Sequence, residues 1–322
     1  MIVLMDQRMD STEHQAFIKS LRSEFQDVEF ITECTNEALE TAIPMADVYY
    51  GMPWQALIEK RQSLRWIHFP ATGIDGLTFS DMKLEDTDIT VTNCRGPHAS
   101  SMGDHTVGMM VTLAHQLNEV WTDQENAQWD RTKYIGRQVE LTGKNLGLLG
   151  AGDIGMAVAH RTHGFGMNIY AVDKNTSPRE PYIPEVWGPE RIDHLMEISD
   201  WLVIAAPLTK ETIGLITSQR IKLMKKGSYI IVVSRGKIVD ENALVKALEE
   251  GHLAGAAVDA FAEEPLPKDS LMWKTKNLLV TPHMSGSTLE LTEGRFNIFR
   301  ENLRRFKASK PFLYTPNLAL GY

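Results

Sequence analysis

The sequence predicts an α/β protein with two domains, each built around a mostly parallel sheet. The length of 322 residues, with 43% hydrophobic and 23% charged residues, suits one large or two ordinary globular domains. Short apolar runs alternate with helical patterns, as they do in βαβ units. These runs fall into two series separated by a long helical segment, so we expect two sheets.

The strands of the first series are expected at five short runs. They are "IVLM" from Ile2, "VEFIT" from Val28, "DVYYG" from Asp47, "LRWIHF" from Leu64 and "ITVTN" from Ile89. The second series begins with "NLGLLG" from Asn145 and continues through "MNIYAVD", "WLVIAA", "SYIIVV", "AGAAVD" and "NLLVT". Each series has enough strands for a sheet of its own.

Two predicted helices connect the series. The first runs roughly from Ser100 to Asn118, with Val107, Met110, Val111 and Ala114 on one apolar stripe. The second, roughly 287–307, returns the chain to the first domain, because the tail "PFLYTPNLALGY" is too short to fold alone. We therefore expect a discontinuous domain of residues 1–100 and 288–322, and an inserted domain of residues 101–287.

The polar segment from Trp121 to Lys144 has no clear core-facing period. A long connection of this kind often serves binding or association.

Composition excludes several classes of function. A net charge of −9 without a long basic run argues against nucleic acid or an anionic membrane as a partner. Only Cys34 and Cys94 occur, which fits unpaired thiols in a reducing compartment. No signal peptide and no apolar stretch of about 18 residues is visible, so we expect a cytoplasmic protein. His160 and His163 lack a third ligand, so no metal site is expected.

A glycine-rich turn follows the first strand of the second series. In "NLGLLGAGDIG", Gly150, Gly152 and Gly155 have G-x-G-x-x-G spacing at the head of a helix. The first glycine permits a tight turn, the second lets backbone approach a pyrophosphate, and the third lets helix and strand pack closely. Asp173 ends the next strand, where an acidic residue binds ribose hydroxyls. The sequence thus predicts a Rossmann doubly wound sheet that binds NAD, while the nearby Lys174 and Arg179 leave NADP open.

Three more strand ends carry polar side chains suited to catalysis. Arg235 follows "IIVVS", Glu264 lies in "AGAAVDAFAEEP", and His283 follows "LLVTP". Alone, they suit a surface ion pair, a loop charge and a helix cap. The carboxyl ends of parallel strands line one edge, so together they can meet in one crevice.

The combination suits the reduction of a ketone by hydride transfer. Negative charge grows on the carbonyl oxygen and needs a proton donor and an electrostatic clamp. His283 can donate the proton, Glu264 can favour its protonated form, and Arg235 can hold a 2-oxo acid through two oxygens.

Several motifs in order resemble the D-isomer-specific 2-hydroxyacid dehydrogenases over nearly the whole chain. They are "GLLGAGDIG", "PLTKETIGLI", "SRGKIVDENAL", "GAAVDAFAEEPLP", "TPHMSGST" and the final "GY". The resemblance implies the Rossmann domain is inserted in a smaller, flavodoxin-like α/β substrate domain. It also implies a homodimer that associates through the cofactor domain.

The resemblance assigns roles by position. Arg235 is the catalytic arginine, Glu264 orients the histidine, and His283 is the acid-base residue. Asp259 would contact the nicotinamide amide, and Thr72 and Gly73 in "ATGIDGL" would bind the substrate carboxylate, although a plain tight turn also fits there. The full set of expected cofactor-binding residues is Gly150, Gly152, Asp153, Ile154, Gly155, Asp173, Pro207, Thr212, Ser234, Asp259, His283 and Gly286.

The substrate is expected to be a small or apolar 2-oxo acid. The loop "YYGMPW" should approach its side chain and offers Met52 and Trp54 but no cation for a phosphate. Formate is disfavoured, because formate dehydrogenases carry an amide where this chain has Glu264. An NAD(H)-sensing protein of the same fold, or a phosphoglycerate or phosphite dehydrogenase, remains the alternative. The sequence leaves open the roles of Met284 and of Arg95 and Asp104, which depart from the family pattern.

Overall fold

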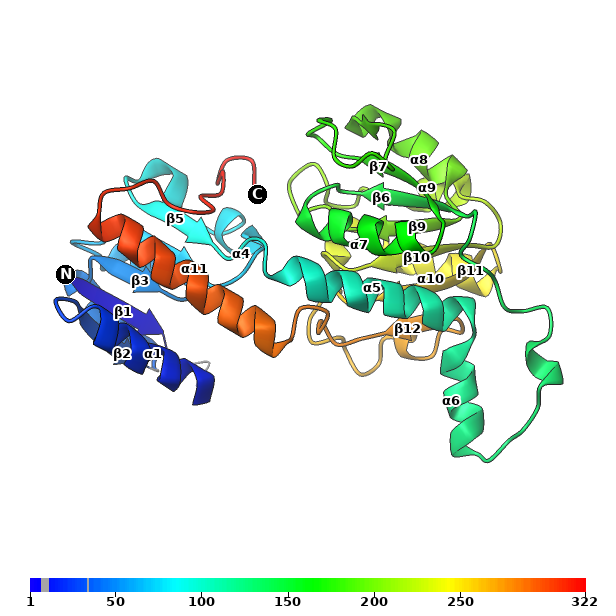
Figure 1. The fold of residues 1–322 in the computed structure, drawn as a ribbon, viewed down its shortest axis with the longest axis horizontal. Coiled ribbons are helices and arrows are strands. Elements are labelled where there is room, and N and C mark those ends of the chain that lie inside the picture. Colours follow the sequence, from blue (N-terminus) through cyan, green and yellow to red (C-terminus); the bar gives the residue numbers. More distant parts are fainter. Residues whose placement is uncertain (7–11, 34) are drawn as a thin grey trace. The chain divides into compact units, whose positions relative to one another are not determined.

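The structure is a computed structural model that describes residues 1–6, 12–33 and 35–322. It divides into two compact units (Figure 1). Unit 1 comprises Met1–Pro97 and Thr288–Tyr322, and unit 2 comprises His98–Ser287. The boundary was expected between residues 100 and 101, and helix α5 begins at His98. Each unit is described below by itself.

In unit 1 the described residues form a five-stranded parallel sheet with the order β2-β1-β3-β4-β5. The strands are β1 (Ile2–Asp6), β2 (Glu29–Glu33), β3 (Val48–Tyr50), β4 (Trp66–Phe69) and β5 (Thr90–Asn93). Strand order reverses between β1 and β3, which is where doubly wound sheets place their ligand crevice.

Helices cover both faces of this sheet, as two separate apolar clusters show (Figure 1). Val3 and Met5 of β1 pack against α1 and α11, whereas Leu4 faces α2 and α3, as the two-residue period of a strand requires. The helices are α1 (Thr12–Glu24), α2 (Asn36–Ala42), α3 (Gln55–Glu59), α4 (Asp75–Thr78) and α11 (Leu289–Lys307), with the 3-10 turns η1 (Ile43–Met45) and η2 (Leu84–Asp86).

In unit 2 the sheet is seven-stranded and parallel, with the order β12-β11-β10-β9-β6-β7-β8. The strands are β6 (Asn145–Leu149), β7 (Asn168–Val172), β8 (Val186–Trp187), β9 (Trp201–Ile204), β10 (Ser228–Val232), β11 (Leu253–Val258) and β12 (Leu278–Val280). The order reverses between β6 and β9. Only β8 was missed in the sequence, since two edge residues carry no periodic pattern.

Helices again cover both faces. Helices α8, α9 and α10 pack on one side, and α5 and α7 pack on the other. The helices are α5 (His98–Ala114), α6 (Leu117–Glu125), α7 (Asp153–Gly164), α8 (Ile192–Ile198), α9 (Ser218–Leu223) and α10 (Glu241–Glu249), with the 3-10 turns η3 (Thr132–Tyr134), η4 (Pro189–Arg191), η5 (Gly236–Ile238) and η6 (Leu271–Trp273). The predicted α/β class with two parallel sheets is therefore confirmed.

The long predicted helix is in fact two helices. Gln116 adopts a left-handed conformation with φ of 59°, so α5 ends before it and α6 starts after it. Half of the predicted stripe is confirmed, because Met110 and Ala114 are buried while Val107 and Val111 are only partly buried. Met109 and Leu113, which were not predicted, are buried as well.

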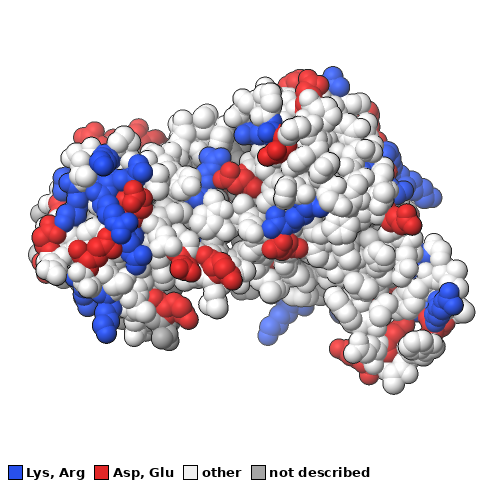
Figure 2. Space-filling model, viewed as in Figure 1, with Lys and Arg blue, Asp and Glu red and all other residues white. Residues whose placement is uncertain are grey.

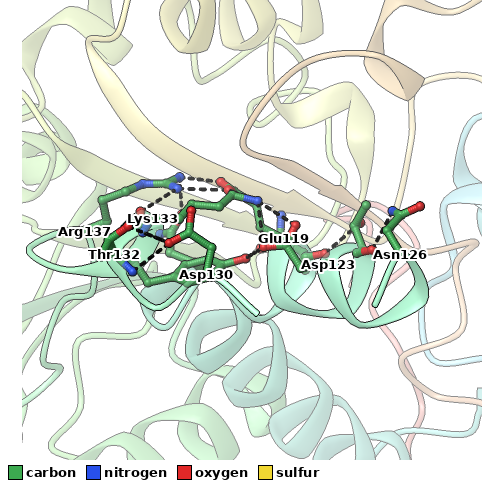
Figure 3. A network of polar contacts seen from close by, with 11 residues as sticks. Glu119, Asp123, Asn126, Asp130, Thr132, Lys133 and Arg137 are labelled. Atoms are coloured by element: carbon green, nitrogen blue, oxygen red, sulfur yellow. Dashed lines mark hydrogen bonds and ion pairs between the residues drawn. The ribbon is translucent and has the colours of Figure 1, made fainter. Parts of the chain in front are cut away.

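The segment after α5 is ordered by a polar network rather than by a core (Figure 3). Asp123 accepts hydrogen bonds from Lys133 Nζ at 2.9 Å and from Tyr134 Oη at 2.6 Å, and both partners lower the pKa of its carboxyl group. Arg137 pairs with Glu119 in the same network. Residues 117–137, which we call the arm, thus have a defined conformation despite their polar sequence.

Charges of both signs are interspersed on the face shown in Figure 2. Basic side chains of α11 are paired with acidic ones: Arg304 lies 2.6 Å from Glu24, and Arg305 lies 2.8 Å from Glu301. Among the described residues, no helix is both long and apolar enough to cross a membrane. Cys94 is buried as a free thiol, and Cys34 lies outside the described residues.

Candidate active site

The glycine-rich turn lies at the carboxyl end of β6, where the strand order of unit 2 reverses. Gly150 has φ of +98°, and a Cβ there would lie 2.6 Å from the backbone nitrogen of Ala206. A Cβ on Gly155 would lie 2.1 Å from the carbonyl oxygen of Gly150. By contrast, nothing lies within 4 Å of the Cβ position of Gly152, so a ligand has room to approach that backbone.

The turn continues into α7 in the manner of an anion-binding helix end. Gly152 precedes the first helical residue, Asp153, which is exposed, while Ile154 is half-buried. The first N–H groups of such a helix have no partner within it and favour a negatively charged ligand. These residues fit the pyrophosphate of a dinucleotide.

Asp173 follows β7 and is held against the glycine turn. Its carboxylate accepts the N–H of Ala151 at 2.7 Å and the N–H of Asn175 at 2.8 Å. Lys174 is paired with Glu211. The negative charge of Asp173 is therefore fixed beside the turn, and the neighbouring cation has an acidic partner.

Two further segments expected to bind the cofactor follow β9 and β10. After β9, the Thr212 hydroxyl donates to the Pro207 carbonyl at 2.7 Å and accepts the N–H of Thr209 at 2.8 Å, which closes a compact loop. After β10, Ser234 is buried and its hydroxyl has no hydrogen-bond partner among the described residues. A buried hydroxyl usually has a partner, so Ser234 also suits a bound polar ligand.

Arg235 directly follows Ser234 and is partly buried. One of its terminal nitrogens donates to the Ser234 carbonyl at 2.9 Å. The next residue, Gly236, is in close contact with the loop after β11, since a Cβ there would lie 2.1 Å from the carbonyl carbon of Phe261. The chain segment that carries Arg235 is thus pressed against the segment that leads to Glu264.

Glu264 and His283 form the pair that the sequence predicted. Nδ1 of His283 lies 2.8 Å from Oε2 of Glu264, and Oε1 of Glu264 accepts the N–H of Phe261 at 2.8 Å. A carboxylate can only accept here, so Nδ1 carries the proton and Nε2 points elsewhere. Both side chains are partly exposed, at 41% for His283 and 36% for Glu264, which leaves the imidazole accessible to a substrate.

Asp259 organises the loop that carries His283. Its fully buried carboxylate accepts the Thr281 hydroxyl at 2.6 Å and the N–H groups of Met284 at 2.9 Å and Ser285 at 3.0 Å. Burial alone would raise the pKa of Asp259, but the hydrogen bonds from Ser285, Thr281 and Met284 outweigh it and lower the pKa. Asp259 therefore holds the loop as a buried anion, and Gly286 lies in the turn that follows.

His105 of α5 completes this network. Its Nε2 lies 3.1 Å from the Thr281 hydroxyl, whose single proton goes to Asp259, so the histidine donates. His283 itself has φ of 48°, an unusual conformation for a residue other than glycine. The hydrogen bonds on both sides of His283 fix this conformation.

In unit 1, Thr72 and Gly73 lie between β4 and α4. The Thr72 hydroxyl donates to the Cys94 carbonyl at 2.9 Å, and the Thr72 carbonyl accepts from the Asn93 side chain at 2.7 Å. The loop is thus fixed to the end of β5, and both residues are half-buried.

A cavity of about 650 Å³ lies at the carboxyl edge of the unit 1 sheet, where its strand order reverses. Met52, the residue predicted to approach the substrate, lines it and is 50% exposed. Asp6, His14 and Arg295 also line the cavity. These three were missed because they come from β1, α1 and α11, which only the fold brings together.

His68 of β4 is enclosed in the core of unit 1. Its Nδ1 lies 2.8 Å from the Thr92 hydroxyl and its Nε2 lies 3.3 Å from the Cys94 sulfur. Burial lowers the pKa of His68 to about 3 and raises that of the Cys94 thiol to about 12. Both groups are therefore neutral structural residues.

Comparisons with known proteins show the family of the chain. Residues 107–285 match the family model described as D-isomer specific 2-hydroxyacid dehydrogenase, NAD binding domain, which covers more than half of the chain. The chain belongs to the D-isomer-specific 2-hydroxyacid dehydrogenase family. It is accordingly an NAD(P)-dependent oxidoreductase of that family, as the motifs predicted.

Individual relatives bear two different activities in their names. The chain is 34% identical over 303 residues to D-3-phosphoglycerate dehydrogenase of Methanocaldococcus jannaschii, which covers 91% of this chain but 55% of that protein. It is 34% identical over 259 residues to glyoxylate reductase of Thermococcus litoralis, covering 78% of this chain and 76% of the relative. A crystal structure of a D-isomer-specific 2-hydroxyacid dehydrogenase family protein from Aeromonas salmonicida is similar with a TM-score of 0.84 at 27% identity, covering 98% of each chain.

The family's cofactor fits the residues described above. The glycine cradle, the open side of Gly152, the fixed Asp173 and the buried Ser234 hydroxyl all suit a dinucleotide. No group of three or more His, Cys, Asp or Glu side chains in the described part of the chain is arranged to hold a metal ion.

Proposed function

We propose that this protein reduces a 2-oxo acid to a D-2-hydroxy acid, and catalyses the reverse reaction, with NADH as the hydride donor. The observation that carries the proposal is the 2.8 Å contact between His283 Nδ1 and Glu264 Oε2 in the unit that carries the NAD-binding family match. In this proposal unit 2 is the cofactor domain and unit 1 is the substrate domain.

His283 acts as the proton donor and acceptor. Because Nδ1 faces Glu264, Nε2 is the nitrogen that can exchange a proton with the substrate oxygen. The negative charge of Glu264 stabilises the imidazolium that must exist before a carbonyl oxygen is protonated. When bound, NADH would supply the hydride to the carbonyl carbon. General acid catalysis of this kind contributes typically about 10²–10⁴-fold in rate.

Arg235 binds the substrate's carboxylate and carbonyl oxygens. Its planar guanidinium can contact both at once, which orients the carbonyl and stabilises growing charge on the oxygen. The backbone N–H groups of Thr72 and Gly73 are proposed to bind the carboxylate as well.

NAD is the proposed cofactor rather than NADP. The fixed carboxylate of Asp173 would repel a 2′-phosphate and accept hydrogen bonds from ribose hydroxyls. Lys174 is paired with Glu211, which reduces its ability to compensate for that repulsion.

The test is the initial rate of NADH and NADPH oxidation with glyoxylate, pyruvate, 2-oxobutyrate and 3-phosphohydroxypyruvate, in both reaction directions. We expect turnover of at least one acid, with a large loss in His283→Gln and Arg235→Ala. Tight NADH binding without turnover of any substrate would contradict the proposal and favour an NAD(H)-sensing role.

A substrate with an anionic distal group is the second candidate, because Arg295 and His14 line the cavity beside Met52. Arg295 supplies the cation that the loop "YYGMPW" lacks, although Asp6 lines the same cavity. If this candidate is right, Arg295→Met should lower kcat/KM for 3-phosphohydroxypyruvate and leave pyruvate nearly unchanged. Equal loss for both acids would contradict it.

We also propose that the protein is a homodimer that associates through the arm. Three large apolar side chains are exposed there: Trp129 at 98%, Ile135 at 68% and Trp121 at 53%. The ion pairs of Figure 3 fix this segment in place, and exposed aromatic residues on a rigid segment favour association. Light scattering should give a dimer mass for the wild type and a monomer mass for Trp129→Ser. A monomeric wild type would contradict this.

A further inference from the structure

Two carboxylates, not one, hold the loop that leads from β11 to Glu264. The N–H of Phe261 donates to Oε1 of Glu264 at 2.8 Å, and the N–H of Ala262 donates to Oε1 of Glu241 at 2.7 Å. These are consecutive backbone groups of one short loop. Glu241 thus fixes the peptide next to the one that Glu264 binds, while the other oxygen of Glu264 contacts His283.

Glu241 is not required as a cap of its own helix. It is the first residue of α10, and the N-cap is Asp240, whose side chain accepts the N–H of Ala243 at 3.0 Å. The Glu241 side chain instead reaches a residue 21 positions later in the sequence. A simple role in helix stability does not explain that contact.

The environment of Glu241 is unfavourable for a charge. Burial raises the pKa of its carboxyl group, the N–H of Ala262 lowers it, and the negative charge of Glu264 raises it further, so that the pKa is raised overall. A like charge near Glu264 is a cost to stability. Such a cost is common where polar groups are held in place for function.

The Arg235 segment is tied to the same loop. A Cβ on Gly236 would lie 2.3 Å from the nitrogen of Ala262, the atom whose hydrogen Glu241 accepts. A shift of Ala262 would therefore move the backbone next to Arg235 as well as the backbone next to Glu264.

We propose that Glu241 is a positioning residue. By accepting the N–H of Ala262, it holds the Glu264–His283 pair and the Arg235 segment in fixed positions relative to one another. It has no contact with substrate in this role. The test of this inference by enzyme kinetics rests on the proposed function, whereas its test by NMR does not.

Three substitutions separate position from charge. Glu241→Gln keeps an acceptor oxygen at the same reach and removes the charge. Glu241→Asp keeps the charge at the start of the helix but shortens the side chain by one methylene, so it cannot reach Ala262. Glu241→Ala removes both, and Glu249→Gln at the other end of α10 is the matched control for a lost charge.

The kinetic test measures kcat and KM with NADH and an accepted 2-oxo acid. We expect kcat to fall by about tenfold or more in Glu241→Ala and Glu241→Asp, because small misplacements of catalytic groups have effects of this size. KM for NADH should change by less than about twofold, since the glycine turn is untouched. Glu241→Gln and Glu249→Gln should retain kcat within about threefold of the wild type.

The spectroscopic test needs no turnover. In the full-length protein with NADH bound, the proton shared by His283 Nδ1 and Glu264 should give a downfield NMR resonance that is absent in His283→Gln. We expect this resonance to persist in Glu241→Gln and to broaden or vanish in Glu241→Asp and Glu241→Ala. If the wild type turns over no 2-oxo acid but the resonance responds in this way, the proposed function fails and the positioning role stands.

Two outcomes would overturn the positioning role. One is an unchanged kcat and an unchanged resonance in Glu241→Asp. The other is a loss in Glu241→Gln as large as in Glu241→Ala, which would show that charge rather than the hydrogen bond matters. If Glu241→Ala does not fold, the kcat values and the resonances of Glu241→Asp and Glu241→Gln decide whether Glu241 is a positioning residue.

Discussion

The Asp259→Asn substitution tests how the His283 loop is held. The carboxylate of Asp259 accepts hydrogen bonds from the Thr281 hydroxyl and from the N–H groups of Met284 and Ser285. An asparagine has one acceptor oxygen, so it can keep the hydrogen bonds from Thr281 and Met284, which share Oδ1 of Asp259. Its NH₂ group then faces the N–H of Ser285, and that hydrogen bond is lost. Losing one hydrogen bond to a charged group costs about 1.5–3 kcal/mol.

Amide hydrogen exchange of Ser285, whose bond is lost, measures this cost locally. The loss corresponds to exchange about tenfold to about 140-fold faster in Asp259→Asn. The pKa of Asp259 is lowered from 3.8, so its contribution is complete above that value and is lost as the pH falls through the folded-state pKa. The ratio of the amide exchange rates in Asp259→Asn and the wild type should therefore be constant near neutral pH.

Asp240→Asn is the matched control for this substitution, because asparagine caps a helix about as well as aspartate. It should leave the exchange of Met284 and Ser285 unchanged. Equal protection of the Ser285 amide in Asp259→Asn and the wild type would refute the claim that Asp259 holds the loop.

Three other predictions follow from contacts in the structure. Gly155→Ala places a Cβ 2.1 Å from the Gly150 carbonyl oxygen and should weaken NADH binding by about tenfold or more, as measured by fluorescence titration. Gly164→Ala is the control, because nothing lies within 4 Å of its Cβ position, and it should bind NADH as the wild type does. Asp173→Ala should increase kcat/KM for NADPH relative to NADH, and an unchanged ratio would count against the role of that carboxylate. Burial lowers the pKa of His68 to about 3, whereas the pKa of an ordinary histidine is about 6.5. Below pH 6.5 the unfolded chain therefore binds a proton that the folded chain does not, and the free energy of unfolding falls by about 1.4 kcal/mol per pH unit. Urea unfolding followed by fluorescence between pH 6 and pH 4 should show that extra slope in the wild type and not in His68→Gln.

Much of the fold could be predicted because its signals are local. The apolar strands and the glycine turn at Gly150 each depend on neighbouring residues, and all the expected strands are present. The break at Gln116 could not be predicted, since a left-handed residue between two helices leaves the apolar period nearly intact.

The site was predictable only in part, for a physical reason. Residues at strand ends, such as Arg235 and His283, share one edge once the sheet is known to be parallel. Glu241 and His105 act from helices, and their partners at Ala262 and Thr281 depend on how those helices pack. Sequence spacing carries no signal for such contacts.

The most direct test of the central claim is a single-turnover measurement of NADH oxidation with an accepted 2-oxo acid in the wild type and in His283→Gln. The proposed chemistry predicts a D-2-hydroxy acid product and a rate about 10²–10⁴-fold lower in the variant, with NADH still bound. A variant that oxidises NADH at the wild-type rate, or an L-configured product, would contradict the assignment of His283 as the proton donor in a D-specific reduction.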